Sequence, residues 1–174
     1  MGIALEDLGP AQVLWGGVDL GESGDITFRC SEDVADHTTA QYGASPKDQV
    51  YVGNSCEVEV NLKESTNTQL ATLFGNATVT ADELMVGSPV GTNMRSIAAQ
   101  LVIKPYVAGA ATADADKWLT IFVAAPQADW EVVFNADGDR EYKGTFKGFR
   151  ATSVASGETY AIGDLFAIGY GEVV

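Results

Sequence analysis

The segment 56–63 constrains the fold most, because its apolar and polar residues alternate without a break. On an extended chain the two sets fall on opposite sides: Cys56, Val58, Val60 and Leu62 against Glu57, Glu59, Asn61 and Lys63. A period of two is typical of an antiparallel strand with one face on a core and the other in water. The segment therefore predicts at least one half-buried sheet.

Short apolar runs and 19 glycines extend this pattern over the rest of the 174 residues. Gly16-Gly17 separates two short apolar runs and predicts a tight hairpin, as does Asp137-Gly138 between two alternating segments. A weak surface cation site is the alternative reading of Asp137-Gly138. A strand is expected to stop at Pro105, and a bulge is expected across Gly148. Further strands are expected at 26–30, 97–104, 118–124, 130–134, 142–147, 160–162 and 165–168.

One short helix is predicted after the segment 56–63. Thr66 and Gln69 have capping-box spacing, Leu70 and Leu73 begin an apolar stripe, and Gly75 suits the helix end. With 46% hydrophobic and 20% charged residues, the chain can build one packed domain over residues 1–174. The expected fold is mainly β, a sandwich or barrel of antiparallel strands with one short flanking α-helix and a long loop.

The expected long loop covers residues 31–48, which are polar and show no apolar face. Connections longer than about 12–15 residues are usually functional or disordered. We therefore expect this loop to order itself on a neighbouring molecule. The candidate contact residues within it are Asp36, His37, Gln41, Tyr42, Gly43, Pro46 and Asp48.

The charge of the chain limits its partners. Asp and Glu number 24 against 10 Lys and Arg, so the net charge is -14. Such a surface repels phosphate backbones and anionic membranes. No apolar run approaches the roughly 20 residues needed to cross a bilayer. We expect no membrane partner and no ordinary nucleic-acid binding.

The residues that carry catalysis are scarce. His37 is the one histidine, and neither a nucleophile turn with its partners nor a phosphate-binding glycine loop is present. The chain is therefore expected not to be an enzyme and to hold neither cofactor nor metal. Cys30 and Cys56 are expected to be reduced, buried thiols, as in a cytosolic protein. The alternative is a metal site that the two cysteines share with His37.

The order of these elements resembles the tail tube proteins of tailed bacteriophages. The resemblance covers residues 9–74 and 143–169 and leaves 76–142 unmatched. It is carried by the hairpin at 9–21, the loop at 41–48, the strand at 56–62, the helix region at 64–74, and the closing segments 144–151 and 160–163.

The resemblance implies a virion structural protein, made in the host cytoplasm and carried in the tail. Subunits of this family form hexameric rings that stack into a tube, with tail terminator, tape-measure and baseplate proteins as partners. DNA passes through during ejection without specific binding. The alternatives are a tail terminator or baseplate ring component, or a monomeric β-sandwich binding module of the capsid-decoration or carbohydrate-binding type.

Glu57 and Glu59 are the candidate lumen residues. They share the polar face of their strand, and the resemblance places this strand in the wall of the tube. We expect them to belong to a negative lining that keeps DNA from adhering. An acidic outer surface that serves solubility is the alternative.

Overall fold

The structure is a computed structural model that describes residues 10–38, 46–64, 66–81, 83–87, 89–134, 140–156 and 158–170. Strands dominate this part of the chain, accompanied by one α-helix and by 3-10 turns at Met94–Ile97 and Ala115–Lys117. In chain order, the elements are β1 (Ala11–Trp15), β2 (Val18–Asp19), β3 (Glu22–Thr38), β4 (Pro46–Glu64), α1 (Asn67–Phe74), β5 (Ala77–Thr80), β6 (Glu83–Val86), β7 (Ala99–Val107), β8 (Ala110–Ala111), β9 (Leu119–Val133), β10 (Glu141–Gly148) and β11 (Phe166–Ile168).

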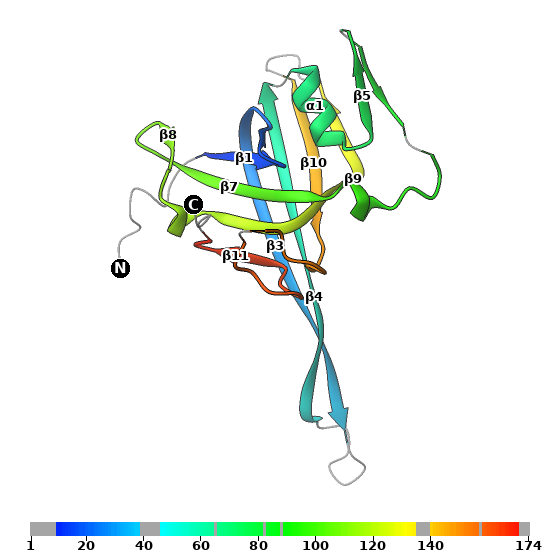
Figure 1. Ribbon diagram of the computed structural model, residues 1–174, viewed down its shortest axis with the longest axis vertical. Helices are drawn as coiled ribbons and strands as arrows, with labels where there is room; N and C mark the ends of the chain where they lie inside the picture. Colours follow the sequence, from blue (N-terminus) through cyan, green and yellow to red (C-terminus); the bar gives the residue numbers. More distant parts are fainter. Residues whose placement is uncertain are drawn as a thin grey trace.

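One antiparallel sheet folds over itself and makes two layers (Figure 1). Its strand order is β2-β1-β7-β9-β10-β4-β3, and β11 pairs with β9. β9 belongs to both layers because its first part pairs with β7 and its second part, from Ala124 on, pairs with β10. Layer A is therefore β2-β1-β7-β9-β11, and layer B is β9-β10-β4-β3. The predicted β-sandwich of antiparallel strands is confirmed.

The core lies between the two layers. The alternation predicted for 56–63 is confirmed, because its four apolar side chains are at most 1% exposed. Layer A contributes Trp15, whose Nε1 donates to the Ala124 carbonyl at 2.8 Å and whose ring lies 5.9 Å from that of Phe146. Burying each large apolar side chain contributes roughly 1.5–3 kcal/mol. The other fully buried positions include Val13, Leu20, Leu101 and Ile121.

The predicted helix is confirmed as α1, with both its caps. The Thr66 side chain accepts from Gln69 N, and the Gln69 side chain accepts from Thr66 N at 2.8 Å. Gly75 ends the helix in the left-handed conformation with φ 63°. Leu70, Leu73 and Phe74 are buried, and Leu73 packs over Gly144 of β10.

The predicted hairpin at Gly16-Gly17 is confirmed. β1 and β2 pair through Leu14↔Asp19 and Trp15↔Val18, and both turn glycines have positive φ, 58° and 79°. This is what a two-residue hairpin turn requires. β9 and β10 pair antiparallel, while Asp137 and Gly138 themselves lie outside the described residues.

The predicted long loop at 31–48 is wrong where the structure describes it. Residues 31–38 continue β3, and residues 46–48 begin β4. A two-stranded ribbon with both faces in water has no inside, so its sequence needs no alternation of apolar and polar residues. Its backbone ladder forms nonetheless, from Ser31↔Ser55 to Thr38↔Pro46.

Three smaller expectations also fail. β7 continues past Pro105 to Val107, because Tyr106 N can still donate to the Pro10 carbonyl at 2.9 Å. The irregular register of β10 lies between Gly144 and Phe146, not across Gly148. The expected strand at 160–162 is absent: this described segment is irregular, and backbone bonds such as Gly163 N to Ala151 O at 2.8 Å hold it.

Candidate functional site

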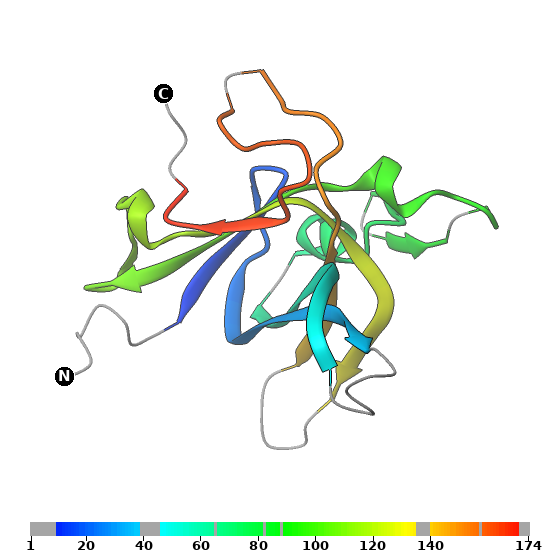
Figure 2. The ribbon, with the colours of Figure 1, turned by 90° about the horizontal axis from the view of Figure 1, so that it is seen from below.

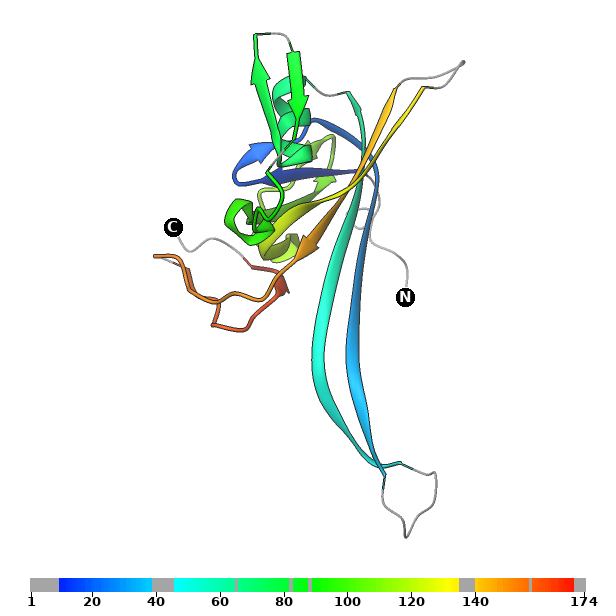
Figure 3. The ribbon, with the colours of Figure 1, turned by 90° about the vertical axis from the view of Figure 1, so that its right-hand side faces the viewer.

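The outer parts of β3 and β4 project from the body as a two-stranded ribbon (Figures 1 and 3). We call residues 31–38 and 46–55 the arm. Where its side chains are described they are exposed or half-buried, because neither layer reaches this part of the ribbon. Seen from below, the body spreads around the arm, with β8 and the β5–β6 hairpin on opposite sides (Figure 2). The described part of the arm is thus left uncovered by the body.

The arm carries large apolar side chains on both of its faces. Val34 pairs with Tyr51 on one face, and Ala35 pairs with Val50 on the other. Val50 is 57% exposed, and the adjacent Val52 is 65% exposed. Neighbouring exposed apolar side chains on a surface commonly mark an interaction site. Sequence reasoning missed these positions: it placed Val34 in a polar loop over residues 31–48 and assigned no role to Val50 or Val52.

The candidate contact residues of the expected loop are distributed along the arm. Asp36 accepts from Gln49 Nε2 at 2.8 Å, and His37 stands opposite Asp48. Pro46 pairs with Thr38 at the last described position. The other three candidates, Gln41, Tyr42 and Gly43, lie outside the described residues.

Arg150 fastens the root of the arm to the body. Its Nη2 donates to the Tyr51 hydroxyl at 2.7 Å and to Asn54 Oδ1 at 3.2 Å. The carbonyl of Arg150 in turn accepts from Arg95 Nη2 at 2.7 Å. These bonds link the arm to the segment after β10 and to the turn before β7, and so set the direction in which the ribbon leaves the body.

The opposite end of the molecule is also apolar. α1, the β5–β6 hairpin and the paired ends of β9 and β10 gather there (Figure 1). Met85 of β6 is 55% exposed, and Phe134, which follows β9, is 72% exposed with Arg140 Cζ 5.2 Å from its ring. Phe134 lies two positions after Val132 and so falls on the same side of the strand pattern, and alternation alone predicts that it is buried. β9 ends before this position, and the Phe134 side chain is left uncovered.

Glu57 and Glu59 lie on the face of layer B that is turned away from the core, as their strand pattern predicts. Glu59 is exposed, Glu57 is half-buried, and Arg29 of β3 forms an ion pair with Glu59 at 2.5 Å. On the other side of β4, Lys147 stands opposite Glu57. Basic side chains from neighbouring strands therefore flank both glutamates.

The polar face of layer B carries both signs of charge and is not uniformly acidic. Lys143 Nζ lies 3.8 Å from Glu131 Oε2, and Asn61 Nδ2 donates to Glu141 at 3.3 Å. Strand register places Arg29 and Lys147 beside Glu57, and Arg29 forms the ion pair with Glu59. Both glutamates therefore lie among bases, and β4 presents no unbroken acidic stripe.

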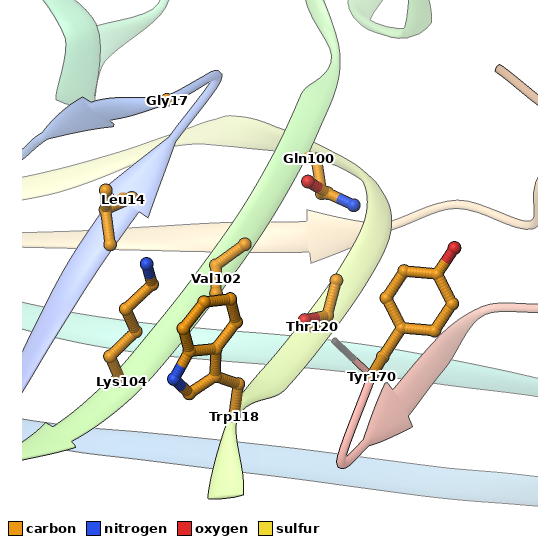
Figure 4. Close-up of a pocket in the computed structure, with 8 residues that line it drawn as sticks. All are labelled: Leu14, Gly17, Gln100, Val102, Lys104, Trp118, Thr120 and Tyr170. Atoms are coloured by element: carbon orange, nitrogen blue, oxygen red, sulfur yellow. The ribbon is translucent and has the colours of Figure 1, made fainter. Parts of the chain in front are cut away.

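A separate hollow of about 220 Å³ lies on the outer face of layer A (Figure 4). Lys104 Nζ sits 3.7 Å from the centre of the Trp118 ring, and Trp118 Nε1 donates to the Thr112 carbonyl. The Thr120 hydroxyl lines the hollow, is buried and has no hydrogen-bond partner among the described residues. The lining can hold a small polar molecule by hydrogen bonds. It has no pairing of a nucleophile with a base.

Among the described residues, no three acidic, histidine or cysteine side chains gather closely enough to hold a metal ion. In the same part of the chain, no helix has both the length and the apolar character needed to span a bilayer. Neither a scan of the chain against models of known protein families nor a search of curated proteins finds a match.

Proposed function

We propose that the protein is a structural subunit of a phage tail tube, in which rings of identical copies stack end to end. The observation that carries this proposal is the exposure of apolar side chains at two opposite ends of one molecule. The exposed side chains are Val50 and Val52 on the arm, and Phe134 and Met85 at the far end. A contact between two different patches is heterologous, and repeated copies of it make an open stack.

Charge favours the same head-to-tail contact. The described arm carries Glu32, Asp33, Asp36 and Asp48 against the single base Lys47. At the far end, where β4 ends and β10 begins, Lys63, Arg140 and Lys143 are exposed. Lys143 pairs with Glu131, so Lys63 and Arg140 are the bases that can face the acidic arm of another copy. Complementary charge of this kind fixes the register of a contact more than it adds affinity.

Ring formation uses the open edges of layer B. In the described part of the chain, β3 pairs only with β4, and β9 beyond Ala124 pairs only with β10. Open edges present unpaired backbone groups that invite another strand. Pairing β3 of one copy with β9 of the next continues the sheet around a ring and removes both edges. The resemblance supplies the number of copies, six.

In such a ring, the polar face of layer B lines the lumen and carries Glu57 and Glu59. Six copies have a total charge of 6 × -14 = -84, so a ring as a whole repels phosphates. On the lining, the acids next to Arg29, Lys143 and Lys147 keep these bases from holding DNA in transit. Tail terminator, tape-measure and baseplate proteins are the expected partners at the ends and inside the tube, and the virion tail is the expected location.

The direct test compares two variants by electron microscopy. Val50→Asp with Val52→Asp places charge on the arm, whereas Val154→Asp changes a valine in the segment after β10 that is also exposed, at 40%. We expect tubes from the unchanged protein and from Val154→Asp, and isolated rings or subunits from the arm variant. Normal tubes from the arm variant, or single subunits from the unchanged protein at every concentration, would contradict the proposal.

The hollow beside Lys104 and Trp118 favours one other candidate function, a monomeric binding module. Its buried, unpartnered Thr120 hydroxyl is the observation behind this alternative. A protein that stays monomeric and binds a small polar molecule with loss on Thr120→Val would support it. Rings that never stack would instead support a tail terminator or baseplate component.

A further inference from the structure

The two cysteines of the chain stand directly opposite each other in the β3–β4 ladder. Directly opposed residues of an antiparallel pair have side chains on the same face and Cα atoms about 4.5 or 5.5 Å apart. Disulfides bridge Cα atoms about 4.4–6.8 Å apart. The backbone therefore holds Cys30 and Cys56 within bonding range before any rearrangement.

The surroundings of the two thiols differ. Both are free, but Cys30 is exposed and Cys56 is buried. The expectation of two buried thiols is thus wrong for Cys30, because β3 is the outermost strand of layer B and leaves one side of that residue uncovered. Burial, and then the neighbouring Cys30, raises the pKa of the Cys56 thiol to about 11. A reagent in solution therefore meets Cys30 first.

The Cys56 side chain is held on the side of β4 away from Cys30. Its sulfur receives a hydrogen bond from the Gly148 backbone. A Cβ on Gly148 would lie only 2.2 Å from that sulfur, so the glycine makes the space that the sulfur fills. To reach Cys30, the Cys56 side chain must rotate to another staggered position about its Cα–Cβ bond.

The pair stands where the arm leaves the body. Next to it on the arm side, the Ser31 and Ser55 hydroxyls hydrogen-bond at 2.9 Å, and the described β3 side chains beyond are exposed. On the body side, Val58 and Val60 are buried in the core. A covalent bond at this level would tie the arm's two strands together at the point where core packing ends.

We propose that Cys30 and Cys56 form a thiol pair that a small disulfide, such as glutathione disulfide, oxidises to a cross-strand disulfide at the root of the arm. The Cys30 thiolate attacks one sulfur of glutathione disulfide, whose S–S bond breaks and releases one glutathione thiolate. Cys56 then loses its proton to solvent, attacks the Cys30 sulfur of the mixed disulfide and expels the second glutathione thiolate. Two protein thiols are oxidised, and one glutathione disulfide is reduced to two glutathiones.

The second step limits the rate, because the attacking group is the thiolate. Burial raises the pKa of Cys56 to about 11 in the reduced pair, so little of this thiol is ionised at pH 8. The mixed disulfide on Cys30 therefore accumulates first and then converts. Conversion accelerates about tenfold for each pH unit between 7 and 9, since the thiolate fraction rises by that factor.

The test follows the full chain by intact mass after incubation with glutathione disulfide and quenching in acid. We expect one glutathionyl adduct first and then a species two hydrogens lighter than the dithiol, with peptide mapping linking residues 30 and 56. In the oxidised form, amide hydrogen exchange should slow in residues 31–38 and 46–55. A non-reducing gel separates this product from disulfides between chains.

Two variants serve as controls. Cys30→Ser should acquire no adduct on the same timescale, because its remaining thiol is buried. Cys30→Ser with Ser31→Cys moves the exposed thiol one position, to the other face of β3, and should stop at the adduct. If the unchanged protein also stops at the adduct between pH 7 and 9, or if the shifted pair closes as fast, the proposal is overturned.

Discussion

Replacing Gly144 with alanine tests how α1 packs on layer B. Gly144 lies in β10 directly beneath the helix, and a Cβ built there would sit 2.7 Å from Leu73 Cδ1 and 3.1 Å from Leu73 Cγ. Gly144 is not among the glycines with positive φ, so alanine would suffer no backbone strain. The whole effect should therefore come from the crowding of one methyl group against one leucine.

The expected loss of stability is the difference between two opposing terms. Forcing a methyl group into a packed site costs about 1–3 kcal/mol. Alanine recovers about 0.5–1 kcal/mol over glycine inside a strand. Gly144→Ala should therefore lower the free energy of unfolding by about 0–2.5 kcal/mol, which corresponds to at most about 10 °C in Tm for a chain of this size.

Leu73→Ala supplies the matched background. Alone it should cost about 2–5 kcal/mol, because it opens a cavity under the helix. In that background the added methyl group meets empty space, so Gly144→Ala should be neutral or stabilising. Urea unfolding of the unchanged protein, the two single variants and the double variant, under conditions where subunits do not assemble, measures the coupling free energy between the two substitutions. We expect this coupling to be about 1–3 kcal/mol. Effects that add to within about 0.5 kcal/mol would refute the packing argument.

The remaining predictions concern capping, pH, salt and the lining. Thr66→Ala should lower the free energy of unfolding in urea by about 1 kcal/mol through loss of the capping box, whereas Thr72→Ala on the exposed helix surface should not; equal losses would exclude a capping effect. Since the folded-state pKa of Cys56 is raised from 9.0 to about 11, the folded state holds this proton more tightly, and its stabilising contribution falls as pH rises from 9 to 11. Urea unfolding across that range should show the decline, and a Cys56→Ala protein that declines equally would assign it to other groups. Assembly followed by light scattering should strengthen with salt, because the Debye length shrinks from about 30 Å at 0.01 M to about 8 Å at 0.15 M and subunits of charge -14 then repel less; steady weakening would mean that ion pairs dominate the contacts. Glu57→Lys with Glu59→Lys should cost about 1–2 kcal/mol, because ion pairing with Arg29 and Lys147 is replaced by repulsion, but should make tubes retain DNA in a co-sedimentation assay; unchanged DNA recovery would remove these residues from the lining.

Local patterns predict the parts of the fold that obey local rules. The alternation in 56–63, the capping box at Thr66 and the glycine pair at 16–17 each act within a few residues, and all three are confirmed. The arm could not be predicted in this way. Apolar and polar residues alternate along a strand when one of its faces is buried, and the arm has no buried face. Its strands are defined only by pairing between residues such as Asp36 and Gln49, which are 13 positions apart.

The mixed charge on the polar face of layer B needs the same long-range information. Glu57 and Glu59 read as an acidic stripe when β4 is considered alone. Their actual neighbours are Arg29, about 30 residues before them, and Lys147, about 90 residues after them, which only the strand register brings together. The opposition of Cys30 and Cys56 is likewise a property of register. It could not be read from the separation of the two cysteines in the sequence.

Electron microscopy of the assembled protein tests the central claim most directly. The claim is that identical copies form sixfold rings, that arms join successive rings, and that the polar face of layer B lines the lumen. A density map should therefore place β3 of one copy beside β9 of the next and direct Glu57 and Glu59 toward the channel. A map with layer B on the outer wall, or with arms that contact no neighbouring ring, would contradict the account.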